Sequence, residues 1–470
     1  MKDHIKTLLL RLPQNLDNVH EVTNILHPYS LAIISGFLKS HNKNITLYDA
    51  AVYRLERESI LEYVIKLKPQ ILGLSIMSQH LHSTLEFLRD IKKLMPEVVV
   101  IVGGPHVCAD HKNLIDNHKE IDIAVTGEGE HTMLELIDSI QNKSVLDNIK
   151  GITYRANGVV KTTPFREYIS DLDSLPFADW GALPMEKYSD AITVKKNYGG
   201  IMASRGCPYS CTFCGAKSAL GVKARRRSPE NILKEINLLY DKYNVRQILF
   251  HDSTFNLDNQ WVSEICEGIL SMNKPLIWGC NLRTERLDTE VLNLMKKSGC
   301  LRVFVGVESA DNEVLKKMKK GTTIERIEEG IRLLEKTGLT TDCGFILGMP
   351  GETEESIKKT IKFAKTIKKG ICTFSLASPF PGSEFYEIAE KEGLNVKDWS
   401  KHDLYTLAYV PKGLTKEKLE SYYKLAVRSF YLRFSFILNQ ILQIRSLRNF
   451  KAFFNAAYSI FFKRFVSFKR

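Results

Sequence analysis

The sequence RGCPYSCTFC at residues 205–214 decides the fold and much of the chemistry. Its three cysteines, Cys207, Cys211 and Cys214, have the spacing C-x3-C-x2-C. Thiolates held this close together on one loop can bind separate irons of an iron–sulfur cluster. No fourth cysteine follows nearby, since the next one is Cys266. A cluster bound at three of its four irons keeps one iron open to a small ligand.

This motif, with the aromatic Phe213 before the last cysteine, resembles that of the radical S-adenosylmethionine (SAM) superfamily. The resemblance implies a [4Fe-4S] cluster whose open iron binds SAM. Reduction would then cleave SAM to a 5′-deoxyadenosyl radical. On the residues alone, a structural zinc site is the alternative. Zinc sites prefer paired C-x2-C units and four ligands, so the spacing favours the cluster.

Composition narrows the class of protein further. The 470 residues allow two or three domains, and 44% hydrophobic and 26% charged residues are ordinary for a globular chain. Nine cysteines in a chain of this length do not make a disulfide framework, and an exposed cluster predicts a reducing, cytoplasmic setting. We expect no signal peptide and, without a run of about 18 uncharged apolar residues, no transmembrane helix.

Residues 1–145 alternate between strand and helix patterns, which predicts a doubly wound, Rossmann-like α/β domain with a parallel sheet. The expected strands are 7–12, 45–49, 71–75, 98–103 and 121–126, and the expected helices are 29–40, 55–67, 83–94, a short one at 110–117, and 131–142. Ligands of such sheets bind at the carboxyl ends of the strands.

Three polar or glycine-rich loops follow the last three of these strands, and glycine lets a backbone approach a bulky ligand closely. This half of the chain resembles the cobalamin-binding domain that precedes the radical domain in one large radical SAM class. The resemblance rests on the GGPH motif at 103–106 and the VTGEGE motif at 125–130. It implies cobalamin contacts from Ser75, Met77, Gly103, Gly104, Pro105, His106, Gly127, Glu128 and Gly129.

The D-x-H-x-x-G motif, whose histidine ligates cobalt in classical methyltransferases, is absent from the sequence. Neither His106 nor His111 has that context, so cobalt would lack a protein histidine below it. On the residues alone, a flavodoxin-like domain that binds another nucleotide, or no ligand, is the alternative.

Residues 146–198 form a connector, with a predicted hairpin around the Ala-Asn-Gly turn at 156–158 and then a proline-rich stretch. The prolines predict an extended linker laid along a surface. Its Leu-Pro-Phe-x-Asp arrangement at 175–179 also recurs in the family that the chain resembles.

Residues 199–385 alternate again, with expected strands at 200–204, 247–252, 276–280, 302–307, 341–347 and 371–376. Helical patterns follow at 230–243, 259–272, 289–297, 323–336 and 354–367. Six such units are too few for a closed eight-stranded barrel. They match the partial (β/α)6 barrel of the radical SAM superfamily.

Functional groups of β/α barrels gather at the carboxyl ends of the strands. The candidates there are Asp252, Ser253, Arg283, Glu308, Ser309, Gly348 and Pro350. The resemblance implies that Glu308 accepts from the SAM ribose hydroxyls and that the loop at 348–351 lies close to the adenine. It also implies that Phe213 offers its backbone to the adenine edge and that Arg283 pairs with the SAM carboxylate.

Two features of this set leave alternatives open. In many relatives a second Asp stands where this chain has Ser253, so a role for that position is in doubt. Ser253, Thr353 and Ser383 also suit helix capping.

The region 386–470 is expected to be helical, basic and amphipathic. Residues 428–470 hold nine Lys or Arg and no Asp or Glu. Apolar residues repeat at helical spacing, first at 430, 434, 437, 438, 441 and 442 and again at 450, 453, 454, 457, 461 and 465. Packing over the open side of the barrel, contact with a membrane or lipid substrate, and nucleic-acid binding are the three interpretations; we expect no nucleic acid.

Together these features predict a cobalamin-dependent radical SAM enzyme that methylates an unactivated carbon of a small molecule or lipid. The same cofactors also support ring formation or rearrangement without methyl transfer, and a non-enzymatic redox sensor is a further alternative. An electron donor such as flavodoxin or ferredoxin is an expected partner. The tail suggests peripheral contact with the inner membrane surface.

Overall fold

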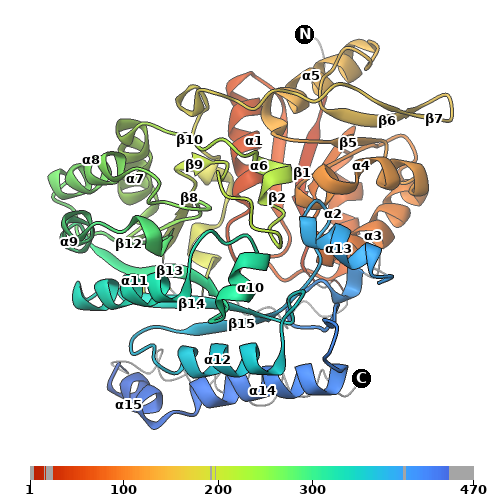
Figure 1. Ribbon diagram of the computed structural model, residues 1–470. Helices are drawn as coiled ribbons and strands as arrows, with labels where there is room; N and C mark the ends of the chain where they lie inside the picture. The colour runs from red at the N-terminus through yellow and green to blue at the C-terminus, as the bar shows by residue number, and fades with distance from the viewer. Residues whose placement is uncertain are drawn as a thin grey trace.

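The computed structural model describes residues 5–14, 16, 25–190, 193–195, 197–394 and 399–443. Two α/β units make up most of it, one around a seven-stranded sheet and one around a six-stranded sheet. Figure 1 shows them side by side, the first in red to yellow and the second in green to blue. Within the described residues, no helix is both long and apolar enough to cross a membrane.

The first sheet has the strand order β2-β1-β3-β4-β5-β6-β7. Its strands are β1 (Thr7–Arg11), β2 (Ile45–Asp49), β3 (Ile71–Ser75), β4 (Val99–Gly103), β5 (Ile123–Val125), β6 (Ile152–Ala156) and β7 (Val159–Thr162). The first five are parallel, and the first four residues of β1 are all buried because helices cover both faces of the sheet. The predicted hairpin is confirmed, but it extends this sheet, which therefore runs past the expected boundary at residue 145.

Five helices flank the first sheet: α1 (Tyr29–Ser40), α2 (Arg57–Leu67), α3 (Leu81–Leu94), α4 (Pro105–Asn117) and α5 (Gly129–Asn142). Helix α4 begins five residues before the expected start at 110. Gly104 has φ +100°, and Pro105 suits the first helical turn. Asp110 interrupts the helix with non-helical backbone angles, and the expected helix covers only the part that begins there.

The second sheet is open and parallel, with the order β15-β14-β13-β12-β11-β8. Its strands are β8 (Tyr198–Ile201), β11 (Gln247–Phe250), β12 (Ile277–Leu282), β13 (Cys300–Glu308), β14 (Thr340–Leu347) and β15 (Cys372–Leu376). The helices α7 (Pro229–Tyr243), α8 (Asn259–Ser271), α9 (Thr289–Lys297), α10 (Asn312–Lys317), α11 (Ile324–Lys336) and α12 (Glu354–Ala364) follow these strands. This confirms the partial six-stranded barrel.

The first expected barrel strand is split in the structure. β8 ends at Ile201, and a separate short strand, β9 (Ser204–Arg205), pairs in antiparallel fashion with β10 (Arg225–Arg226). Two of the three suggested caps are confirmed, because Thr353 caps α12 and Ser383 caps α13 (Glu384–Lys391). The helix after β11 is capped by Asp258 instead of Ser253.

The large side chains of the proline-rich connector are buried between the two units, so a linker that merely lies along a surface does not describe it. Trp180 is 1% exposed and Tyr188 is 2% exposed. Trp180 donates to Glu235 on α7 (Nε1 to Oε1, 2.8 Å), and Tyr188 donates to Asp49 at the end of β2 (Oη to Oδ2, 2.9 Å). The connector thus joins the two sheets into one continuous apolar core.

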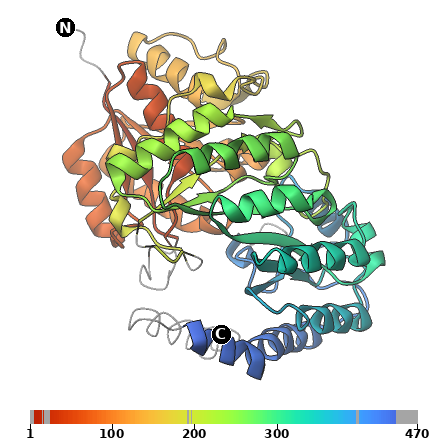
Figure 2. The same cartoon turned by 90° about the vertical axis from the view of Figure 1, so that its left-hand side faces the viewer.

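The C-terminal region packs on the far edge of the barrel. Helix α14 (Lys416–Tyr431) buries Leu419, Tyr423, Ala426, Val427 and Phe430 and lies against α12 and β15. In Figures 1 and 2, α14 and α15 (Phe434–Gln443) form the lower edge of the molecule. The packing interpretation therefore holds for α14. The second apolar repeat, from 450 to 465, lies outside the described residues.

Candidate active site

The cysteine loop leaves β9 and ends at the short helix α6 (Ala216–Leu220). Gly206 precedes the first cysteine with φ +88°, and a Cβ there would come within 2.2 Å of the carbonyl oxygen of Lys223. Only glycine fits so close an approach at a positive φ. Thr212 donates its backbone N–H to Met318 O (2.9 Å) and accepts one from Phe385 (2.8 Å), so both α10 and α13 hold the loop.

The three thiols fit a cluster. Cys207, Cys211 and Cys214 are all free. Cys214 reaches the surface, yet the protein atoms around it desolvate the thiol and raise its pKa, and the nearby Cys211 and Cys207 raise it further. Cationic irons would relieve this mutual repulsion of thiolates. Among the described residues no three such groups converge on a single metal ion, and a cluster does not require it, because each cysteine binds a different iron.

Arg283 lies beside this loop. Its Nη1 is 3.9 Å from the sulfur of Cys211, and its guanidinium lies 3.7 Å from the centre of the Tyr209 ring. It also pairs with Glu285 (Nη2 to Oε1, 3.1 Å) and donates to the carbonyl of Lys320. Because Glu285 already neutralises Arg283, the predicted pairing with the SAM carboxylate would have to replace this partner.

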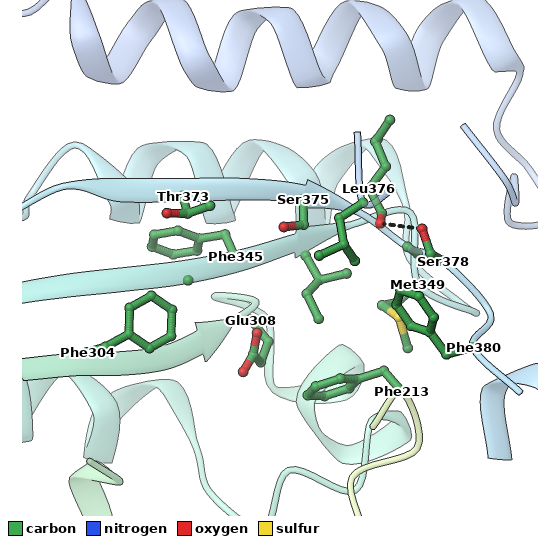
Figure 3. Close-up of a pocket in the computed structure, with 14 residues that line it drawn as sticks. Phe213, Phe304, Glu308, Phe345, Met349, Thr373, Ser375, Leu376, Ser378 and Phe380 are labelled. Atoms are coloured by element: carbon green, nitrogen blue, oxygen red, sulfur yellow. Dashed lines mark hydrogen bonds between the residues drawn. The ribbon is translucent and has the colours of Figure 1, made fainter. Parts of the chain in front are cut away.

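Glu308 ends β13 with φ +66°, just after a shift in the register of pairing with β14. Such an irregularity re-aims a side chain, and Figure 3 shows Glu308 pointing into the same pocket as Phe213. Its Oε1 lies 2.8 Å from Lys320 Nζ. The carboxylate keeps acceptor sites beyond this ion pair, so Glu308 fits the predicted role toward ribose hydroxyls.

The turn after β14 is held by a residue that the sequence did not single out. Glu352 is 1% exposed and accepts from the backbone N–H groups of Gly348 and Met349. Burial raises the pKa of Glu352 to about 8, although these two hydrogen bonds oppose the shift. The sequence signal that could have identified Glu352 is an acidic residue directly after the Met-Pro-Gly turn. Pro350 belongs to the turn that Glu352 shapes.

Three other predicted residues have different surroundings. Asp252 accepts from Ala203 N (3.1 Å) and from the Ser204 hydroxyl, and burial raises its pKa to about 6. It therefore fixes the corner before the cysteine loop. Ser309 is fully buried and contacts Thr360 (Oγ to Oγ1, 3.3 Å), whereas Ser253 is exposed at the end of β11.

The barrel has a partly open cavity of about 170 Å³ along β13, β14 and β15 (Figure 3). Phe213 reaches it from the cysteine loop. Its other lining residues are mostly apolar, with four polar members: Phe304, Glu308, Gly344, Phe345, Ile346, Met349, Thr373, Ser375, Leu376, Ala377, Ser378, Phe380 and Leu404. The cavity can thus hold an apolar group next to the cluster loop.

The predicted cobalamin loops gather at the carboxyl edge of the first sheet. Ser75 and Met77 are exposed there, and Gly104 packs so closely that a Cβ would come within 2.6 Å of the Ser75 hydroxyl. Gly103 and Pro105 flank it, and Gly127 has φ +77°. Exposed apolar Met77 beside glycine backbone fits a large planar ligand such as a corrin.

His106 and Glu128 are engaged with protein groups. The His106 Nδ1 lies 2.9 Å from the Ser78 hydroxyl, and its ring meets the Trp399 ring edge-on with centroids 4.8 Å apart. Burial lowers the pKa of His106 to about 4, so the ring is neutral near pH 7. Glu128, which precedes Gly129 at the start of α5, binds two arginines of the radical unit.

The fold and the cysteine loop define a class of protein: an α/β ligand-binding domain joined to a partial barrel that carries a three-cysteine cluster site. The comparisons with known proteins agree with this class. A family model described as the radical SAM superfamily matches residues 201–364, and one described as the B12 binding domain matches residues 16–137.

An uncharacterized methyltransferase of Pyrococcus horikoshii is 29% identical over 442 residues, which are 93% of this chain and 95% of that protein. An anaerobic magnesium-protoporphyrin IX monomethyl ester cyclase of Rubrivivax gelatinosus is 28% identical over 89% of this chain and 76% of its own length.

Two solved structures share the fold. The radical SAM methyltransferase TsrM of Kitasatospora setae, with cobalamin and a [4Fe-4S] cluster bound, has a TM-score of 0.72 at 19% identity over 91% of this chain and 89% of its own. The cobalamin-dependent radical SAM enzyme OxsB has a TM-score of 0.75 at 18% identity over 98% and 72%. The chain thus carries a radical SAM domain and a B12-binding domain, as the two motifs predicted, and shares its fold with cobalamin-dependent radical SAM enzymes.

Proposed function

We propose that the protein methylates an unactivated carbon of a small molecule that enters the barrel cavity. One observation carries this proposal: Phe213 of the cysteine loop, Glu308 and Met349 of the loop at 348–351 line the same largely apolar cavity. The cluster with SAM would supply a 5′-deoxyadenosyl radical, and cobalamin would supply the methyl group. The similarity to the Pyrococcus methyltransferase, which spans almost the whole of both chains, supports methyl transfer.

In this proposal the protein orients its cofactors and protects a reactive intermediate. Cys207, Cys211 and Cys214 hold the cluster, and Glu308 accepts from the SAM ribose hydroxyls. Phe213 and Met349 line the cavity on the side of the cluster loop and keep water from the reacting carbon. Dry, aromatic walls limit side reactions of a radical.

The substrate that fits this cavity is apolar at the reacting carbon and carries few polar groups. Hydroxyl groups come from Thr373, Ser375 and Ser378. Among the lining residues described, the one ionisable side chain is that of Glu308, and Lys320 balances its charge. A lipid or another hydrocarbon-rich small molecule fits a cavity with this lining. In the basic C-terminal region, Leu432 is 49% exposed and Phe434 is 80% exposed. These apolar side chains support delivery of such a substrate from a membrane surface.

Ring formation without methyl transfer is the second candidate, because the Rubrivivax relative is a cyclase of similar identity and coverage. The two activities differ in the fate of SAM. Both activities yield 5′-deoxyadenosine and methionine from one SAM, and methyl transfer also consumes a second SAM and yields S-adenosylhomocysteine.

The deciding experiment uses anaerobic, cluster-reconstituted protein with hydroxocobalamin, SAM and flavodoxin or dithionite as the electron donor. Candidate lipids and small apolar compounds are added, and products are analysed by mass spectrometry. A product heavier by one methylene, with both SAM-derived products, supports methylation. 5′-Deoxyadenosine without S-adenosylhomocysteine would favour ring formation. An intact cluster that never cleaves SAM would favour the sensor alternative.

A further inference from the structure

The loop after β5, which resembles a cobalamin-binding motif, holds the cysteine loop of the other unit. Glu128 Oε1 lies 2.9 Å from Arg205 Nη1, and Glu130 Oε1 lies 2.6 Å from Arg205 Nη2. Arg205 is the second residue before Cys207. One guanidinium therefore spans two carboxylates of the B12-binding unit at the point where the cluster loop begins.

A second arginine closes the arrangement. Arg225 Nη1 lies 2.9 Å from both carboxylate oxygens of Glu128 and also donates to the carbonyl of Ile169 in the connector (2.6 Å). The backbone N–H of Ile169 donates to Glu128 Oε2 (2.6 Å). Arg205 and Arg225 are themselves paired across β9 and β10. Three parts of the chain thus meet at Glu128.

These groups are out of solvent. The side chains of Glu128, Glu130, Arg205 and Arg225 are 5%, 3%, 9% and 8% exposed. Two carboxylates and two guanidiniums balance in charge, and each Glu oxygen in these contacts has a charged or backbone donor. Removing one member of such a buried, hydrogen-bonded set leaves an uncompensated charge, so loss of either glutamate disturbs the arginine that precedes the cysteine loop.

We propose that Glu128 and Glu130 are positioning residues for the cluster: through Arg205 they set the place of the cysteine loop relative to the B12-binding unit. Their role is then not to bind cobalamin, although Glu128 lies in a cobalamin-like motif. The inference rests on the proposed function in taking the three cysteines as cluster ligands. It follows that a change at Glu130 alters the cluster, although the residue belongs to the other domain.

The test uses the full chain, reconstituted anaerobically with iron, sulfide and hydroxocobalamin. Glu130→Gln keeps the size of the side chain and removes its charge from Arg205. Arg205→Lys keeps the charge but lacks the fork that reaches both carboxylates. Glu135→Gln is the matched control, because Glu135 lies on the same helix α5, pairs with Arg166 and is 45% exposed.

We expect Glu130→Gln and Arg205→Lys to change the EPR spectrum of the reduced cluster in the same way. Iron affinity should fall on the order of 10-fold, as for other residues that orient metal ligands. Corrin absorption retained after gel filtration should stay at the wild-type value, and Glu135→Gln should change none of these readouts.

An unchanged EPR spectrum and iron content in folded Glu130→Gln protein would overturn the proposal. So would loss of corrin with an unchanged cluster, which would make these residues cobalamin ligands. The proposal would also be overturned if Glu130→Gln and Arg205→Lys both failed to fold while Glu135→Gln folded. The contacts of Arg205 with the two glutamates would then serve folding alone. None of these readouts requires SAM cleavage, so a wild-type protein that holds a cluster but cleaves no SAM would refute the proposed function separately.

Discussion

Lys320 Nζ lies 2.8 Å from Glu308 Oε1, the two side chains are 9% and 11% exposed, and Glu308 lines the barrel cavity. The ion pair joins the end of β13 to the segment after α10. It places a positive charge beside the Glu308 carboxylate, which keeps acceptor sites beyond this contact. An ionised carboxylate is the better acceptor for hydroxyl groups.

Glu308→Gln should therefore weaken SAM binding more than it weakens the cluster. We expect the SAM concentration at half-maximal 5′-deoxyadenosine formation to rise about 10-fold, which corresponds to about 1.4 kcal/mol for a lost charged hydrogen bond. The cluster absorption should not change. Glu313→Gln, at an exposed position on α10, is the control and should leave SAM binding unaltered.

The same ion pair gives a stability prediction. Glu308→Gln and Lys320→Met should each lower the melting temperature, because each leaves one buried charge alone. The double variant Glu308→Gln/Lys320→Met should melt closer to the wild type than either single variant. Additive losses, measured by thermal unfolding, would show that the pair contributes nothing as a pair.

Variants of the three cysteines test whether the cluster and the cobalamin are bound independently. Substitution of Cys207, Cys211 or Cys214 by Ala should abolish SAM cleavage, because the cluster needs all three ligands. The corrin band of the purified protein should remain, since the loops after β3 and β4 do not contain these residues. Simultaneous loss of corrin would mean that the cluster supports the cobalamin site. The retained corrin absorption per protein decides between these outcomes.

Much of the fold could be predicted because buried parallel strands leave continuous apolar runs between helices with a 3.6-residue period. Of the predicted site residues, Phe213 and Glu308 meet at the cavity with the turn at 348–351, as expected for neighbouring strand ends. The pairing of Arg205 with Glu128 and Glu130 could not be predicted, because the residues are more than 70 positions apart and lie in different units. The burial of Trp180 could not be predicted for a similar reason, because its partner Glu235 lies 55 positions later in the chain, on α7.

Glu352 predicts a pH dependence of stability. Its pKa in the folded protein, about 8, lies above its ordinary value of 4.5, because burial disfavours the charged form. The folded state then holds a proton that the unfolded state has released, so stability falls as pH rises from about 5 to about 8. Glu352→Gln cannot release this proton and should show a flatter dependence of melting temperature over that range. Equal slopes for the two proteins would mean that Glu352 titrates normally.

The C-terminal helices offer a matched pair of phenylalanines. Phe430 is fully buried on α14 between β15 and the following helix, whereas Phe434 is 80% exposed at the start of α15. Phe430→Ala should cost about 3–5 kcal/mol of unfolding free energy, as for other buried aromatic residues. Phe434→Ala should cost less than about 0.5 kcal/mol. Denaturant unfolding measures both.

Phe434→Ala also tests the membrane interpretation of the tail. If Phe434 inserts among lipids, Phe434→Ala should reduce flotation of the protein with vesicles that contain anionic lipid, and high salt should reduce it further by screening the basic residues. The melting temperature of this variant should stay at the wild-type value, which excludes an effect through unfolding. Flotation that is equal for wild type and Phe434→Ala would leave Phe434 without a lipid role. In that case packing, which Phe430 on α14 already provides, would be the interpretation left for α14 and the start of α15.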